Sequence, residues 1–282
     1  TMAVWTRPKG SAVMGASLSG DDRDQWPAVS NDIVNGGHDP RDELGDNHAT
    51  HGTQWYAPHY AEPVNPAPKS SARTATSPAS FAYAEALVPE PDGAAAARGR
   101  ADDLGLECIS PGVGAALTLL SRLLEARAVV EIGTGAGACA LALLAGMASD
   151  GVLTSIDAEA EHQLAAREVL TAEGVPSRRV RLIAGQALAV LPKLTDGAYD
   201  IVYVDGDPLE YVEYVAQAQR LLRRGGLLVL HHALWQGLVA DERNDDDEPL
   251  IIREALEAVL ADESFTPALL PLGDGLLVAV RG

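Results

Sequence analysis

The residues best suited to bind a charged ligand lie in a short segment that starts at Val129. An apolar run there contains a carboxylate, Glu131, and leads into three glycines at alternate positions, Gly133, Gly135 and Gly137. A segment rich in alanine and leucine follows at once. This order predicts a buried strand, a tight turn and the start of a helix, where backbone N–H groups are free to bind a ligand. The segment is therefore expected to be a nucleotide-binding loop.

The glycine spacing and the carboxylate indicate which nucleotide this loop binds. The glycines form G-x-G-x-G, whereas dinucleotide-binding folds use G-x-G-x-x-G. Glu131 would repel a pyrophosphate, but it would attract the ammonium and sulfonium groups of S-adenosylmethionine. The alternative for Glu131 is that it caps the amides of its own loop. Thr134, between the first two glycines, can hydrogen-bond a ligand. We therefore expect Glu131, Gly133, Thr134, Gly135 and Gly137 to bind the cofactor.

Further cofactor contacts are expected at the ends of the next two strands. Asp157 follows an apolar run, where a carboxylate can accept both ribose hydroxyls of an adenosine. It can also cap the helix that follows, and the two roles are compatible. Its neighbour Ala158 joins the expected cofactor-binding set. Gln186 and Ala187, at the end of the third strand, are expected to frame the adenine ring.

The elements that must position these residues alternate regularly along the chain. Strands are expected at 128–132, 152–156, 179–183, 199–204 and 226–230, and helices at 137–148, 159–173, 186–194, 209–222 and 249–262. Such repeats predict an α/β fold whose parallel sheet is covered on both faces. Two more apolar runs, 266–270 and 276–280, flank an Asp-Gly turn and predict an antiparallel hairpin. The expected sheet is therefore seven-stranded and mostly parallel.

The chain before these repeats divides into two parts. Residues 1–76 are rich in polar residues, proline and glycine without a sustained period, which predicts a disordered tail or an upstream extension. The domain is expected to span 77–282. Ser77 followed by proline predicts a helix start. Further helices are expected at about 92–104 and 112–126, where they can cover the cofactor cleft or make a subunit contact.

Composition limits the partners of this chain. Acidic residues number 40 and basic residues 21, a net charge of −19, which argues against binding to nucleic acid or to anionic membranes. No apolar run reaches the roughly 18 residues of a membrane span. The two cysteines do not form a disulfide framework, so a reducing compartment is expected. We therefore expect a cytoplasmic protein that acts on a small-molecule substrate and not on nucleic acid or membranes, although the charge does not identify that substrate.

Five segments together resemble the cation-dependent O-methyltransferases related to catechol and caffeoyl-CoA O-methyltransferases, closest to their actinobacterial branch. They are EIGTGAG at 131–137, ID at 156–157, YDIVYVDGD at 199–207, LLRRGG at 221–226 and LWQGLV at 234–239. The resemblance covers residues 77–281. It implies a Rossmann-like class I methyltransferase fold with extra N-terminal helices, S-adenosylmethionine as cofactor, a phenolic or catechol-like hydroxyl acceptor and a homodimer. It also implies cofactor contacts from Ile109, Cys139 and Asp205.

The catalytic half departs from the family pattern. In the family, a divalent cation binds the first Asp of an Asp-Ala-Asp-Lys run and a later Asp-Asn pair. Asp205 matches the first ligand, but Pro208 stands where lysine is common, and the later pair is His231-His232. Mg²⁺ prefers oxygen ligands, whereas two imidazoles and one carboxylate favour Fe²⁺, Zn²⁺ or another transition metal.

Three interpretations of Asp205, His231 and His232 remain open. The metal is lost and a histidine acts as general base; or the three residues hold a softer metal; or the site is degenerate and the protein binds S-adenosylmethionine without catalysis. Because adjacent strand residues face opposite ways, both histidines can face one site only if the strand has ended at residue 231. An NAD-dependent oxidoreductase is a further alternative, which the glycine spacing and Glu131 disfavour.

Overall fold

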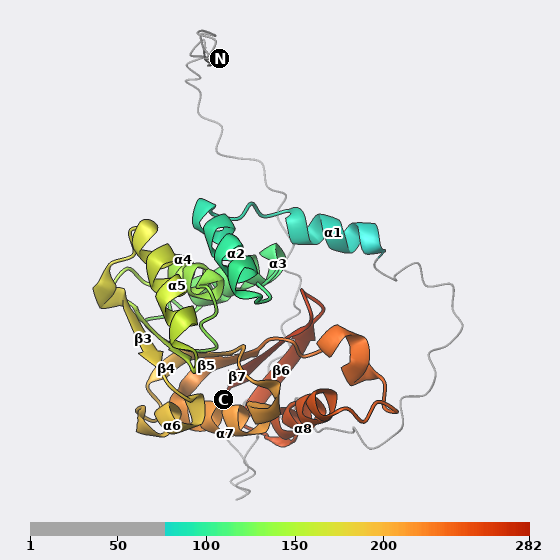
Figure 1. Cartoon of the computed structure of the whole chain (residues 1–282). Helices are drawn as coiled ribbons and strands as arrows, with labels where there is room; N and C mark the ends of the chain where they lie inside the picture. Colours follow the sequence, from blue (N-terminus) through green and yellow to red (C-terminus); the bar gives the residue numbers. More distant parts are fainter. Residues whose placement is uncertain (1–76) are drawn as a thin grey trace, which may run out of the picture. The chain divides into compact units, whose positions relative to one another are not determined.

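The computed structural model describes residues 77–282, so the tail predicted for 1–76 lies outside the described residues. A seven-stranded sheet runs through this region in the order β3-β2-β1-β4-β5-β7-β6 (Figure 1). Strands β1 to β5 pair in parallel, whereas β7 is antiparallel to β5 and β6 is antiparallel to β7. The strands are β1 (Ala128–Ile132), β2 (Val152–Asp157), β3 (Val180–Ala184), β4 (Tyr199–Val204), β5 (Leu222–Leu230), β6 (Phe265–Leu270) and β7 (Leu276–Arg281). The predicted sheet and its C-terminal hairpin are confirmed.

Helices connect these strands and precede the first of them. The α-helices of the described residues are α1 (Pro78–Ala86), α2 (Asp92–Leu104), α3 (Pro111–Leu123), α4 (Ala138–Gly146), α5 (Ala160–Ala172), α6 (Ala187–Val190), α7 (Tyr211–Leu221) and α8 (Asp247–Ala261). Short 3-10 helices are η1 (Ser177–Arg179), η2 (Leu191–Lys193), η3 (Pro208–Glu210) and η4 (Trp235–Ala240). The predicted start of α1 is confirmed, because the Ser77 hydroxyl accepts a hydrogen bond from the Ser80 amide at 3.1 Å. Among the described residues, no helix combines the length and the apolar character that crossing a membrane requires.

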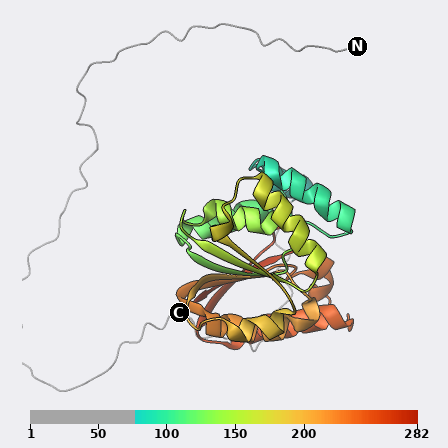
Figure 2. The ribbon, with the colours of Figure 1, turned by 60° about the vertical axis from the view of Figure 1, so that its left-hand side comes forward.

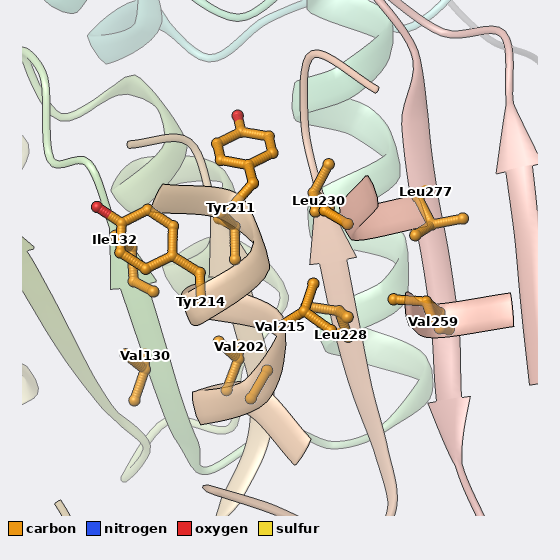
Figure 3. Close-up of a cluster of buried hydrophobic side chains, with 14 of the residues drawn as sticks. Val130, Ile132, Val202, Tyr211, Tyr214, Val215, Leu228, Leu230, Val259 and Leu277 are labelled. Carbon is orange, nitrogen blue, oxygen red and sulfur yellow. The ribbon is translucent and has the colours of Figure 1, made fainter. Parts of the chain in front are cut away.

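Helices cover both faces of the sheet, which gives three layers (Figure 2). Alternation along each strand sends neighbouring side chains to opposite layers. In β1, Val129 joins the core beneath α3 and α4, while Val130 joins the core beneath α7 and α8. Figure 3 shows the second core, where Val215 of α7 faces Leu228 of β5. This double burial explains why the strands are nearly continuous runs of apolar residues.

Three elements differ from the sequence prediction by more than two residues. Strand β5 starts at Leu222 instead of residue 226, and its pairing with β4 shifts register between Tyr199 and Ile201. The helix predicted for 186–194 is only α6 followed by η2, since Pro192 has no amide hydrogen to continue an α-helix. The third N-terminal helix, predicted to reach residue 126, ends at Leu123, and Glu125 turns left-handed at φ 48°. None of these differences moves a strand end that faces the cleft.

Candidate active site

A cleft of about 740 Å³ opens at the carboxyl ends of β1, β2, β4 and β5, where parallel α/β sheets bind their ligands. Most residues predicted for the site line this cleft: Ile109, Gly133, Thr134, Gly135, Cys139, Asp157, Ala158, Gln186, Ala187, Asp205, His231 and His232. Glu131 and Gly137, also predicted to bind the cofactor, are not among the lining residues. The fold therefore collects residues from distant parts of the sequence around one cavity.

The three glycines of the loop after β1 serve different purposes. A Cβ on Gly133, at φ 92°, would lie 2.0 Å from the Asp205 carbonyl oxygen. A Cβ on Gly137, at φ 94°, would meet Ala166 of α5 at 3.2 Å. Gly135, at φ 48°, has no atom of the described chain within 4 Å of its Cβ position. The outer glycines therefore allow close packing, and the middle one leaves space where a ligand can approach the backbone.

Glu131 lies beneath the loop and is fully buried. Within residues 77–282, neither of its carboxylate oxygens has a hydrogen-bond partner, so the alternative that it caps its own loop is wrong for this structure. Burial raises the pKa of Glu131 to about 8; the nearby Ser155 hydroxyl opposes this shift, and the charges of Asp205 and Asp157 reinforce it. An unpaired buried carboxylate is costly, and a cationic ligand nearby would relieve that cost.

Asp157 organises the wall of the cleft. Its Oδ2 accepts hydrogen bonds from the amides of Thr134 at 2.9 Å and Gly135 at 3.1 Å. Its Oδ1 accepts from the Glu159 amide at 2.9 Å, next to the start of α5, and lies 3.1 Å from His162 Nδ1. Asp157 therefore holds the glycine loop, but the prediction that it caps the following helix is wrong, because Glu159 is the N-cap residue of α5 and no side chain caps that helix. His162 also lines the cleft, and no sequence motif marked it.

Two predicted residues direct their side chains into the protein. The Thr134 hydroxyl is 2.6 Å from the Ser155 hydroxyl and accepts a hydrogen bond from Gln163 Nε2 at 2.7 Å. These protein partners use the hydroxyl, so it is not directed toward a ligand in the cleft. Cys139 is buried, with Sγ 3.6 Å from Asp205 Oδ2. Burial raises the pKa of its thiol well above the usual value, which keeps it neutral and suits a packing role.

The two histidines meet Asp205 because their strands are neighbours. Val204 pairs with Leu230, so the residues that follow each strand emerge side by side. Strand β5 ends at Leu230, and His232 has a left-handed backbone at φ 53°. His231 Nδ1 lies 3.0 Å and His232 Nε2 3.5 Å from Asp205 Oδ1. The condition for both histidines to face one site is therefore met.

Asp205 is held as an ionised acceptor. Burial alone would raise its pKa, but His231, His232 and the Tyr203 hydroxyl together lower the pKa below the usual value. Tyr203 donates to Oδ2 at 3.1 Å. Sequence reasoning missed Tyr203 as a site residue, although Asp205 directly follows β4 and the two-residue spacing places both side chains on one face. Tyr211 is the first residue of α7 (Figure 3). Its hydroxyl donates to the His231 carbonyl at 3.1 Å and fixes the end of β5.

The two histidines differ in their surroundings. The side chain of His231 is 5% exposed, and its Nε2 lies near Gly273 on the β6–β7 turn. The side chain of His232 is 21% exposed, and its Nδ1 lies 3.0 Å from Asp274 Oδ2. His232 is therefore the more accessible of the two from the cleft.

The cleft is strongly acidic. Its lining contains the carboxylates of Glu107, Asp157, Glu159, Asp205, Asp207, Glu210 and Asp274. Among the described residues that line it there is no lysine or arginine. Such a surface attracts cationic ligands and repels phosphates. The sequence showed the net negative charge, but not that these carboxylates converge on one cavity.

The strand order, the glycine loop and the ligand cleft at the sheet's carboxyl edge define a Rossmann-like class I methyltransferase. The O-methyltransferase family model matches residues 102–282, and the chain belongs to this family. A relative from Mycobacterium sp. (strain JLS) named "Putative O-methyltransferase" is 48% identical over 209 residues, which cover 74% of this chain and 95% of that protein.

Solved structures agree with this assignment. A Corynebacterium glutamicum protein is 33% identical, with a TM-score of 0.66 over 71% of this chain and 94% of its own. The O-methyltransferase TomG from Streptomyces achromogenes, solved in complex with SAM, is 27% identical, with a TM-score of 0.65 over 71% of this chain and 94% of its own. The predicted fold and family are confirmed.

Proposed function

We propose that this protein transfers a methyl group from S-adenosylmethionine to a hydroxyl oxygen of a small phenolic or catechol-like acceptor. The observation that carries this proposal is the acidic cleft, which joins the glycine loop at one end to the Asp205–histidine cluster at the other. The sulfonium donor is cationic, so this cleft suits it. The complex of TomG with SAM supports the same donor.

Donor binding uses the residues predicted for the cofactor. Asp157 and the open space at Gly135 face the ribose side, and Gln186 with Ala187 lies at the end of β3 for the adenine. Ile109 approaches from the segment before α3. Glu131, buried beneath the loop without lining the cleft, keeps its proton in the unliganded protein and would supply negative charge once a cationic ligand binds nearby.

His232 is the better candidate for the general base. The reaction forms a C–O bond, breaks the S–CH₃ bond and releases the acceptor hydroxyl proton, which passes to His232 Nε2. The Asp205 carboxylate, 3.5 Å away, stabilises the resulting imidazolium. The cleft also aligns acceptor oxygen, methyl carbon and sulfur, and such alignment contributes up to roughly 7–11 kcal/mol in favourable cases.

The family's metal requires a separate test against these residues. Asp205, His231 and His232 offer ligand atoms within 4.8 Å of one another, but two of the three are imidazole nitrogens. This donor set does not fit Mg²⁺, which prefers oxygen, whereas it suits Zn²⁺ or Fe²⁺. Held by these three residues, such an ion would lower the pKa of the acceptor hydroxyl. The carboxylate partner of His232, Asp274, suits a general base and a metal ligand equally. We propose the metal-independent mechanism, and activity in EDTA decides between the two.

Calorimetry and a methyl-transfer assay test the proposal. S-adenosylhomocysteine is expected to bind, and NAD⁺ is expected to give no heat because its pyrophosphate would enter an acidic cleft. Binding of NAD⁺ alone would contradict the proposal. A panel of catechols and phenols, assayed with and without EDTA, separates the enzyme from a binding protein that lacks activity.

We also propose that the protein is a homodimer located in the cytoplasm. Within residues 77–282, α1 has no buried side chain, and Phe81, Tyr83 and Leu87 are exposed, so this helix is suited to pack against a second copy. The two cysteines are free thiols, which agrees with a reducing compartment. Analytical ultracentrifugation tests the dimer, and a Tyr83→Ser/Leu87→Ser variant is expected to sediment as a monomer.

A further inference from the structure

Asp274, on the turn between β6 and β7, lies on the cleft, although the sequence marked it only as part of the Asp-Gly turn and not as a site residue. We propose that Asp274 is a positioning residue whose carboxylate keeps the proton of His232 on Nδ1 and leaves the Nε2 lone pair available to the acceptor hydroxyl. The catalytic consequence rests on the proposed function. The tautomer itself is a property of the protein and can be measured without substrate.

The hydrogen bonds around Asp274 determine the direction of the contact with His232. Asp274 Oδ1 accepts from the Gln236 amide at 2.6 Å, and Oδ2 lies 3.0 Å from His232 Nδ1. An ionised carboxylate can only accept, so Nδ1 must donate. A neutral imidazole carries one proton, and placing it on Nδ1 makes Nε2 the acceptor.

The backbone fixes Asp274 against the histidine segment. The Leu234 amide donates to the Asp274 carbonyl at 2.9 Å, and the Ala233 amide donates to the Gly275 carbonyl at 3.2 Å. Gly275 has φ 88°, and a Cβ there would lie 2.7 Å from the Leu234 amide nitrogen. Only glycine allows the hairpin turn to approach this closely. The separation between Asp274 and His232 is therefore set by the fold.

Nε2 of His232 is the nitrogen that can serve the reaction. It lies 3.5 Å from Asp205 Oδ1, which already accepts from His231 Nδ1 at 3.0 Å. Because neither Nε2 nor Oδ1 then carries a proton, their contact is not a hydrogen bond, and a hydroxyl entering the cleft can donate to Nε2. After proton transfer, the imidazolium lies between the carboxylates of Asp205 and Asp274. In catalytic triads, likewise, a carboxylate orients the histidine base and stabilises its protonated form.

The variant Asp274→Asn tests whether Asp274 sets the His232 tautomer or only holds the β6–β7 turn in place. The backbone N–H of Gln236 can only donate, so the side-chain oxygen of the asparagine keeps that hydrogen bond and the asparagine NH₂ group faces His232. Nδ1 must then accept, which moves the histidine proton to Nε2 and removes the acceptor lone pair. Asp245→Asn, an exposed position in the loop before α8, is the matched control because it removes the same charge.

The direct readout is the tautomer of His232 in ¹⁵N-labelled, ligand-free protein at alkaline pH. Two-bond ¹H–¹⁵N spectra report which ring nitrogen is protonated, and the signal absent from His232→Gln assigns the residue. We expect the Nδ1–H form in the wild type and in Asp245→Asn, and the Nε2–H form in Asp274→Asn. A wild-type His232 protonated on Nε2, or an unchanged tautomer in Asp274→Asn, would overturn the proposal.

The kinetic readout uses S-adenosylmethionine and catechol. We expect Asp274→Asn to lower kcat about 100-fold, in the range of general-base contributions, while calorimetric affinity for S-adenosylhomocysteine stays within about twofold. A kcat within about twofold of the wild type would contradict the catalytic role. A wild type that methylates no panel member counts against the proposed function, and the tautomer measurement then decides the proposal for Asp274 independently.

Discussion

At the scale of single residues, the carboxylates of this site have distinct environments and distinct tasks. Asp157 accepts from backbone amides and holds the glycine loop, whereas Asp205 accepts from Tyr203 and His231. Glu131 has no hydrogen-bond partner among the described residues, and its pKa is raised to about 8. Environment, more than residue type, therefore decides which carboxylate is ionised and which is poised to change charge.

The raised pKa of Glu131 predicts a pH-dependent stability. Between its ordinary value of 4.5 and about 8, the folded state keeps a proton on Glu131 that the unfolded state releases. Wild-type stability therefore falls as pH rises through this window, by up to about 1.4 kcal/mol per pH unit. Glu131→Gln cannot ionise, so its Tm relative to wild type should rise from pH 5 to pH 9.

Thermal melts across that range check this prediction, with Glu257→Gln on the exposed face of α8 as control. The control should differ from the wild type by a constant amount. The same Glu131→Gln variant should bind S-adenosylhomocysteine and S-adenosylmethionine with a smaller preference for the cationic methionine form. A Tm difference that does not change with pH would show that Glu131 is already ionised in the folded protein near pH 5.

Sequence reasoning identified most of the side chains of the site but not their partners. Asp205, His231 and His232 were predicted, since motif position and residue chemistry mark them. Asp274 was not, because its contact with His232 joins residues 42 positions apart and depends on the hairpin folding back. The Thr134 hydroxyl was predicted to face a ligand, but Ser155 and Gln163 occupy it, and no local pattern encodes that competition.

At the scale of elements, the edge of the sheet brings the site together. The loop after β1 packs onto the end of β4, and the end of β5 packs onto the β6–β7 turn. Strand periodicity and the Asp-Gly turn predicted these elements. The early start of β5 was missed because Arg223, Arg224 and Gly225 resemble a loop; they lie in the irregular part of the strand, between Leu222, which pairs with Tyr199, and Leu227, which pairs with Ile201. The pairing of Leu222 with β4 sets the start of the strand, and local propensity does not.

The contact between the loop after β1 and the end of β4 predicts that alanine is more destabilising at Gly133 than at Gly135. Gly133→Ala would place its Cβ against the Asp205 carbonyl and also force alanine to a strained positive φ. Gly135→Ala meets only the φ strain, about 1–3 kcal/mol. We expect Gly133→Ala to be more destabilising in urea unfolding and to weaken S-adenosylhomocysteine binding more than tenfold. Equal losses of unfolding free energy for the two variants would show that the loop can move away from Asp205.

At the scale of the whole molecule, the chain has a net charge of −19, and part of that charge lines the cleft. The cleft carries seven carboxylates and, in the part of the chain that the structure describes, no lysine or arginine along its walls. The field therefore favours a cationic donor and disfavours phosphorylated or acyl-CoA acceptors. This distribution separates the chain from a dinucleotide enzyme more firmly than the glycine spacing does.

The field of the cleft predicts an order among acceptors of similar shape. Dopamine, 4-methylcatechol and 3,4-dihydroxybenzoate carry positive, neutral and negative side groups. We expect kcat/KM to fall in that order at low salt, by about tenfold or more between the first and the last. Added NaCl should compress the difference, because salt screens interactions beyond the Debye length of about 10 Å at 0.1 M. A preference for the benzoate would contradict this electrostatic explanation.

The most direct test of the proposed chemistry is the rate of methyl transfer from S-adenosylmethionine to catechol by EDTA-treated protein, measured for the wild type and for His232→Gln. If His232 is the general base, the wild type keeps its rate in EDTA and His232→Gln loses about 100-fold in kcat. Activity that EDTA abolishes and a divalent metal restores would contradict the metal-independent mechanism. A His232→Gln variant as fast as the wild type would remove this histidine from it.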